Sequence, residues 1–178
     1  DAEGGAAHRL PSPASRNLYT DIAAYGGTPI RALTNEANAV SADNALLDDG
    51  ELLGLLADAT PEEIDSLINW ARGDFDGDLS TTDDTLYQMG DPLHARAATA
   101  IYGGTADNPD MVVFVATNDG YLHAIDAATG VEKWAFVPPE FLADQARLLE
   151  NPASGTKHYG IDGNLRLQVL TNDHDGIV

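Results

Sequence analysis

Four short runs of β-forming residues, separated only by turn-forming residues, occupy most of the stretch from Met89 to Leu142. They are Ala95–Tyr102, Met111–Thr117, Tyr121–Asp126 and Val131–Val137. Asn118-Asp119-Gly120 and Ala128-Thr129-Gly130 stand between runs and tolerate the positive φ angles that tight hairpins require. The outer runs end at Gly103-Gly104 and Pro138-Pro139. Strands at this spacing predict a four-stranded antiparallel meander.

The second of these runs constrains the architecture further. Met111–Ala116 is apolar at every position, so we expect this strand to be buried on both faces. In a β-propeller, each blade is a four-stranded antiparallel meander that packs between two neighbouring blades. The predicted fold class is therefore mainly β with helical insertions, namely a partial β-propeller and a fragment of a larger domain.

The stretch also carries a family resemblance. The run VATNDGYLHAIDAATGVEKWAFVPPEFL, with MGDPLHAR before it and HYGIDGNLRL after it, resembles the PilC/PilY family. Members are large calcium-dependent proteins of type IV pilus assembly and pilus-tip adhesion. The blade residues alone are also similar to quinoprotein propellers of the pyrroloquinoline-quinone (PQQ) dehydrogenase type, in which an indole such as Trp134 packs between blades.

The resemblance implies a function, a location and partners. It implies a non-enzymatic, calcium-binding protein that regulates pilus extension, retraction and surface attachment. Such a protein would be exported through the periplasm to the cell surface or pilus tip. Its partners would be pilins or minor pilins, a host or abiotic surface, and the remainder of its own chain. A PQQ-dependent dehydrogenase fragment and another calcium-dependent surface protein are the alternatives.

The charge balance narrows the possible partners. The chain carries 29 acidic and 9 basic residues and a net charge of −20, a balance that disfavours binding to nucleic acid or to anionic membranes. It favours divalent cations. No apolar run is long enough to span a bilayer, and the absence of cysteine excludes disulfides and thiolate ligands.

An acidic segment follows the clearest helix signal in the chain. Thr60-Pro61-Glu62-Glu63 predicts a capped helix start, and Gly73 is placed to end that helix. Carboxylates then occupy alternate positions, as in the first half of an EF-hand, which binds Ca²⁺ through oxygen ligands. The predicted calcium ligands are Asp74, Asp76, Asp78, Ser80, Asp83 and Asp84. Gly77 and Thr85 depart from the EF-hand pattern, and a solvated acidic turn is the alternative.

Further expectations concern the flanking segments. Arg16–Thr20 is β-like, Asp43–Leu56 suggests two short helices, and Pro139–Leu149 a helix capping the blade. Leu165–Leu170 predicts the opening strand of a second blade, followed by a weaker calcium loop with Asp173 and Asp175. The five histidines show no metal-ligand spacing, and no serine stands in a nucleophile elbow, so no catalytic residues are predicted.

These elements suggest a division of the chain into parts. Residues 1–15 would form a flexible leader, and residues 16–88 a strand plus a helical insertion with the acidic loop. Residues 89–149 would form the first blade with its capping helix. Residues 150–178 would begin a second blade that is cut off.

Overall fold

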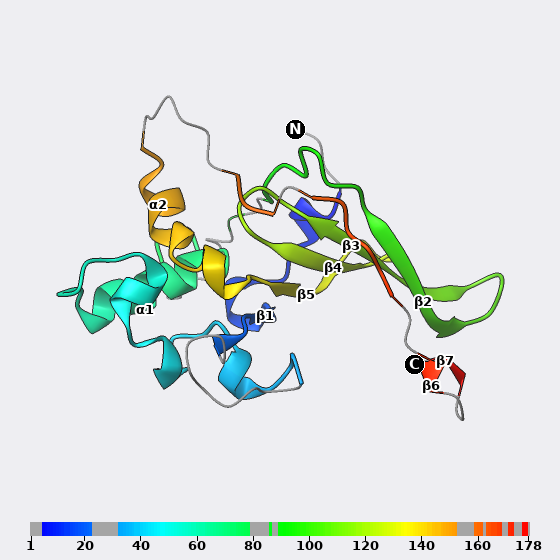
Figure 1. Cartoon of the computed structure of the whole chain (residues 1–178), viewed down its shortest axis with the longest axis horizontal. Helices are drawn as coiled ribbons and strands as arrows, with labels where there is room; N and C mark the ends of the chain where they lie inside the picture. Colours follow the sequence, from blue (N-terminus) through cyan, green and yellow to red (C-terminus); the bar gives the residue numbers. More distant parts are fainter. Residues whose placement is uncertain are drawn as a thin grey trace.

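The fold was obtained as a computed structural model. It describes residues 5–22, 32–78, 86, 89–152, 159–161, 163–168, 171–172 and 176–177. Within these residues the protein is a mixed five-stranded sheet with few helices, and is mainly β. Helices gather at the end of the sheet near β1 and β5, while the β2–β3 hairpin projects away from them (Figure 1).

The predicted antiparallel meander is confirmed. Its strands are β2 (Ala98–Gly104), β3 (Pro109–Ala116), β4 (Leu122–Asp126) and β5 (Glu132–Phe136), each hydrogen-bonded to the next. A short fifth strand, β1 (Leu18–Tyr19), comes from the β-like run Arg16–Thr20 and pairs in parallel with β5. The N-terminal part of the chain therefore supplies one edge of the sheet, and β2 supplies the other.

Two details of the strands differ from expectation. Gly103 and Gly104 were expected to follow strand β2, but both belong to it and pair with β3 after a shift of register between Ile101 and Gly103. The prediction that Met111–Ala116 is buried on both faces is wrong. One face of β3 is buried, and the other face is half-covered because the packed elements reach only part of it.

The helical part begins with short turns and leads into helix α1 (Pro61–Ala71). Thr60 and Glu63 form the predicted capping box, with each side chain accepting from the other residue's backbone N–H. The chain leaves the helix through Gly73, whose φ of 100° is the left-handed conformation that glycine adopts readily. The 3₁₀ turns η5 (Ala45–Leu47) and η6 (Gly50–Leu53) stand where two short helices were expected.

The predicted helix over Pro139–Leu149 forms in two pieces. A 3₁₀ turn, η7 (Pro139–Phe141), is followed by helix α2 (Asp144–Glu150). The main core lies between this region, α1 and the β1–β5 end of the sheet. Its fully buried members include Leu18, Leu47, Leu67, Ile68, Val137 and Leu142.

Other short elements lie towards the two ends of the chain. The 3₁₀ turns η1 (Ala7–Arg9), η2 (Pro13–Ser15) and η4 (Glu36–Asn38) precede the main helix. Residues 163–168 form no strand, so the strand predicted from Leu165 is wrong over the part of it that is described. A small pairing of β6 (Thr171–Asn172) with β7 (Gly176–Ile177) follows. Among the described residues, no helix has the length and apolarity needed to cross a membrane.

Gly54 offers a test of how the helical part packs. Its φ is 84°, and a Cβ atom at this position would overlap the carbonyl oxygen of Ala143, just before α2. We expect Gly54→Ala to lower the free energy of unfolding by at least about 1–2 kcal/mol, from the left-handed backbone alone. Urea unfolding followed by circular dichroism would measure the loss.

Gly103→Ala is the matched control for this substitution. A Cβ atom at Gly103 meets nothing within 4 Å, so this variant should unfold at the urea concentration of the wild type. Equal stability of Gly54→Ala and the wild type would contradict the packing of η6 against the start of α2.

Candidate metal centre and buried polar network

The acidic loop, defined as residues 74–78, directly follows helix α1. Asp74, Asp76 and Asp78 each offer a carboxylate oxygen, and the three oxygens lie within 4.8 Å of one another. Asp74 is 1% exposed, whereas Asp76 and Asp78 are exposed. The structure therefore brings together the first three of the predicted ligands. The cluster could hold a metal ion, and its geometry alone does not identify which one.

The spacing of the three carboxylates is short enough for one cation to contact all three. Calcium binds oxygens at about 2.3–2.6 Å, so two ligands of one ion can lie up to about 5 Å apart.

The Asp78 backbone N–H lowers the pKa of the Asp76 carboxyl, but partial desolvation and the charges of Asp78 and Asp74 outweigh this effect. The pKa of Asp76 is therefore raised, as expected where carboxylates lie close together.

The other predicted ligands cannot be placed. Ser80, Asp83 and Asp84 lie outside the described residues, as do Asp173 and Asp175 of the weaker second loop. Their participation in cation binding stays a prediction.

Asn69, in the last turn of α1, fixes the acidic loop and was not predicted from sequence. Its backbone oxygen accepts from the Asp74 N–H at 3.1 Å, and its side-chain Nδ2 donates to the Gly77 carbonyl at 2.9 Å. Gly77 has a φ of 80°, and a Cβ atom there would lie 2.5 Å from the Ser66 carbonyl oxygen. The loop can pack this closely against the helix because Gly77 has no side chain.

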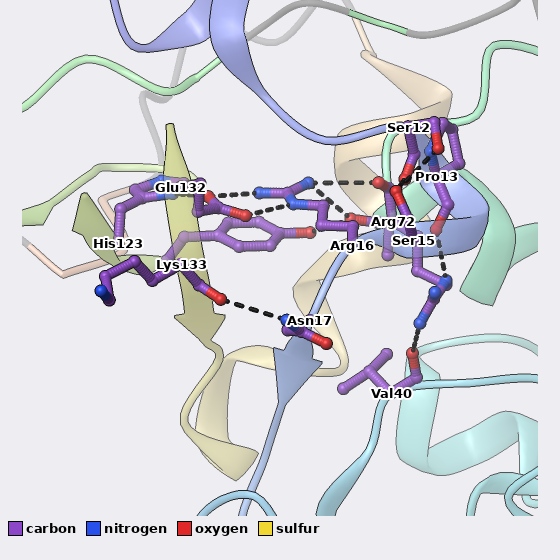
Figure 2. A network of polar contacts seen from close by, with 12 residues as sticks. Ser12, Pro13, Ser15, Arg16, Asn17, Val40, Arg72, His123, Glu132 and Lys133 are labelled. Carbon is purple, nitrogen blue, oxygen red and sulfur yellow. Dashed lines mark hydrogen bonds and ion pairs between the residues drawn. The ribbon is translucent and has the colours of Figure 1, made fainter. Parts of the chain in front are cut away.

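A buried polar network joins the helical part to the sheet (Figure 2). Arg16 donates from Nε and Nη2 to the two oxygens of Glu132, at 2.7 and 3.1 Å. Glu132 Oε2 also lies 2.6 Å from His123 Nδ1. Burial alone would lower the pKa of Arg16, but the charge and hydrogen bonds of Glu132 raise it. A bidentate, fully enclosed pair of this kind holds its partners in one geometry.

The same network reaches the end of α1 and helix α2. Arg16 Nη1 donates to the Arg72 carbonyl at 3.3 Å, and the Tyr121 hydroxyl donates to the Ala71 carbonyl at 3.0 Å. The Tyr121 hydroxyl also contacts Gln145 Oε1 at 2.8 Å. Segments far apart in the sequence thus meet at one point.

Part of the network has the order of a catalytic relay, in which a hydroxyl, an imidazole and a carboxylate follow one another. The Thr117 Oγ1 atom lies 3.2 Å from His123 Nε2, and His123 in turn contacts Glu132. However, the Thr117 hydroxyl donates to Asp119, and all three relay residues are buried. The adjoining cavity has a volume of about 40 Å³, which suits a water molecule rather than a substrate. We therefore assign these residues to stabilising the fold.

The turn Asn118-Asp119-Gly120 binds two segments that are distant from it in the sequence, one before the sheet and one after it. The Gly90 N–H donates to Asp119 Oδ2 at 2.8 Å, and the Asp91 N–H to Asn118 Oδ1 at 2.9 Å. The Gly160 N–H donates to the Asn118 carbonyl at 2.9 Å. A Cβ atom at either Gly90 or Gly160 would lie 2.5 Å from this turn. The segments Gly90-Asp91-Pro92 (GDP) and Tyr159-Gly160 (YG) thus both pack on the turn between β3 and β4.

The sheet face away from the main core carries a second apolar cluster. Val112, Phe114 and Ala124 form it, and half-buried Trp134 packs on Phe114 with ring centroids 5.9 Å apart. Leu165 packs against the same cluster, which covers part of the face. A cavity of about 280 Å³ remains beside Trp134.

Comparison with known proteins adds one relative. No protein-family model and no solved structure matches the chain. The chain is similar to a type IV pilus biogenesis factor PilY1 homolog from Xylella fastidiosa (strain Temecula1), with 43% identity over 70 residues. The alignment covers 39% of this chain and 6% of the relative. This partial match suggests the PilY1 family at most, and with it, loosely, type IV pilus biogenesis.

The buried network predicts a specific dependence of stability on pH. Burial alone would raise the pKa of Glu132, but the hydrogen bond with His123 and the charge of Arg16 lower it to about 2, from 4.5. Because the folded pKa lies below the unfolded one, the stabilisation is fully present above pH 4.5. It is lost as pH falls towards 2, and amounts to on the order of 3 kcal/mol.

Comparing the free energy of unfolding of the wild type with that of Glu132→Gln separates the contribution of Glu132 from that of the other carboxylates. The variant should be less stable than the wild type at pH 6, and the difference should shrink between pH 4.5 and 2. Urea unfolding at several pH values would measure both proteins. A difference that stays constant across this window would contradict the charged Glu132 pairing.

Proposed function

We propose that this chain is a calcium-binding propeller segment of a type IV pilus biogenesis and tip-adhesion protein. It would be exported and act at the cell surface or pilus tip, where it affects pilus extension, retraction and attachment. Its partners would be pilins or minor pilins and a host or abiotic surface. The observation that carries the proposal is the 43% identity to the PilY1 homolog over 70 residues.

The sheet supports the propeller part of the proposal. A four-stranded antiparallel meander is the unit of a propeller blade, and its apolar second face, with Trp134 and Phe114, suits packing against another blade. Leu165 already contacts that face from the segment in which a second blade was predicted. The docking of GDP and YG on the β3–β4 turn gives both motifs of the resemblance a structural role.

The acidic loop supports the calcium part. Three carboxylates within 4.8 Å repel one another, and a divalent cation would remove this repulsion. Asp76 and Asp78 are exposed and can adjust to the larger, irregular coordination shell of calcium. Magnesium requires near-octahedral geometry and retains several waters, so this loop suits it less well. Calcium would fix the loop against the end of α1.

Calorimetric titration of calcium into the chain tests the cation site. We expect saturable binding that Asp76→Asn weakens at least about tenfold, because a ligand charge is removed while the shape is kept. Magnesium should bind much more weakly than calcium. Asp107→Asn, which neutralises an exposed carboxylate in the β2–β3 loop, is the control and should bind as the wild type does. Absence of wild-type binding would make the loop a solvated acidic turn.

A genetic experiment tests the role in pilus biogenesis separately. In the source bacterium, deletion of the gene encoding this chain should reduce the number of surface pili counted by electron microscopy. Re-expression of the wild-type gene should restore them, and the Asp76→Asn allele should restore them less well when calcium is limiting. Normal pili in the deletion strain would refute the proposed role, whatever the result of the titration.

A further inference from the structure

The acidic loop and the sheet are attached to the same turn of helix α1. On one side, Asn69 holds the loop through its backbone oxygen and its side-chain amide. On the other side, the carbonyl oxygens of Ala71 and Arg72 accept from Tyr121, directly before β4, and from Arg16, shortly before β1. Only one turn of helix therefore separates the carboxylates from the sheet contacts.

Asn69 also indicates that the loop is built to receive a ligand. Its side chain is directed into the loop by the bond to Gly77, and its residue is 7% exposed. The Oδ1 atom of this side chain is buried and has no hydrogen-bond partner among the described residues. A buried oxygen without a partner is costly, and an additional bound species, such as a cation or its water, would supply the missing partner. This observation is independent of the acidic cluster itself.

Arg16 lies close to the start of the loop. A Cβ atom placed on Gly73, the residue before Asp74, would lie 3.6 Å from Arg16 Nη1. Both oxygens of Glu132 compensate the charge of Arg16. Without Glu132, an uncompensated guanidinium would stand beside the loop and disfavour a cation there.

We propose that cation binding in the acidic loop and the docking of α1 on the sheet are coupled through residues 69–72. This inference rests on the cation site proposed above. A bound cation orders the loop and thereby fixes the carbonyl acceptors of Arg16 and Tyr121. Because such coupling is reciprocal, a cation that strengthens the docking of α1 by a given factor must itself bind the docked form more tightly by the same factor. Variants that weaken the contacts between α1 and the sheet should therefore lower the affinity for the cation.

Tyr121→Phe is the sharpest test of this coupling. The substitution removes the hydroxyl that contacts the Ala71 carbonyl and Gln145, leaves every charge in place and lies outside the acidic loop. We expect calcium affinity, measured calorimetrically on the full chain, to fall by about fivefold or more. Tyr102→Phe removes an exposed hydroxyl from β2 and is the matched control, with wild-type affinity expected.

A second variant and a second measurement complete the experiment. Glu132→Gln should weaken calcium binding further, while Glu140→Gln, at an exposed site, should not. In the wild type, calcium should slow hydrogen exchange of the amides in β4 and β5, a measurement that needs no variant. Undiminished affinity of Tyr121→Phe, or unchanged exchange in β4 and β5, would overturn the coupling while leaving the cation site intact. Absence of calcium binding by the wild type would instead refute the site, and the coupling with it.

Discussion

The buried pairing of Arg16 with Glu132 is the interaction on which the joining of the N-terminal segment, α1 and the sheet depends. Charged groups are enclosed only at a large desolvation cost, which is offset when both partners are fully hydrogen-bonded. Here the guanidinium uses two donors on Glu132 and directs a third towards the end of α1. Removing either partner would leave the other charged and enclosed, which is strongly destabilising. The packing of the N-terminal segment, α1 and the sheet on one another would then be lost as a unit.

Much of the fold could be predicted because its signals are local. Turn residues between apolar runs defined the meander, and the Thr60–Glu63 pattern defined the start of α1. Alternate aspartates after a helix likewise placed Asp74, Asp76 and Asp78 in one cluster. Each of these features is decided by neighbours only a few residues away.

The remaining features depend on contacts that sequence patterns do not show. Arg16 and Glu132 are 116 residues apart, and nothing in the local sequence pairs them. A carboxylate at an inward-facing position of strand β5, close to His123 across the sheet, was the available signal that Glu132 needed a partner. The half-covered face of β3 and the division of the helix after Pro139 likewise follow from packing, because both depend on which elements happen to lie against them.

The parallel pairing of β1 with β5 has a consequence for how the chain acquires its structure. Residues near Leu18 are synthesised well before their partners near Ala135, which emerge only after more than a hundred further residues. Closing so long a loop is entropically unfavourable until the meander offers a formed edge. The segment that carries β1 is thus expected to pair later than the hairpins of the meander. A nascent chain halted before β5 would keep its N-terminal segment unpaired and accessible to chaperones or proteases.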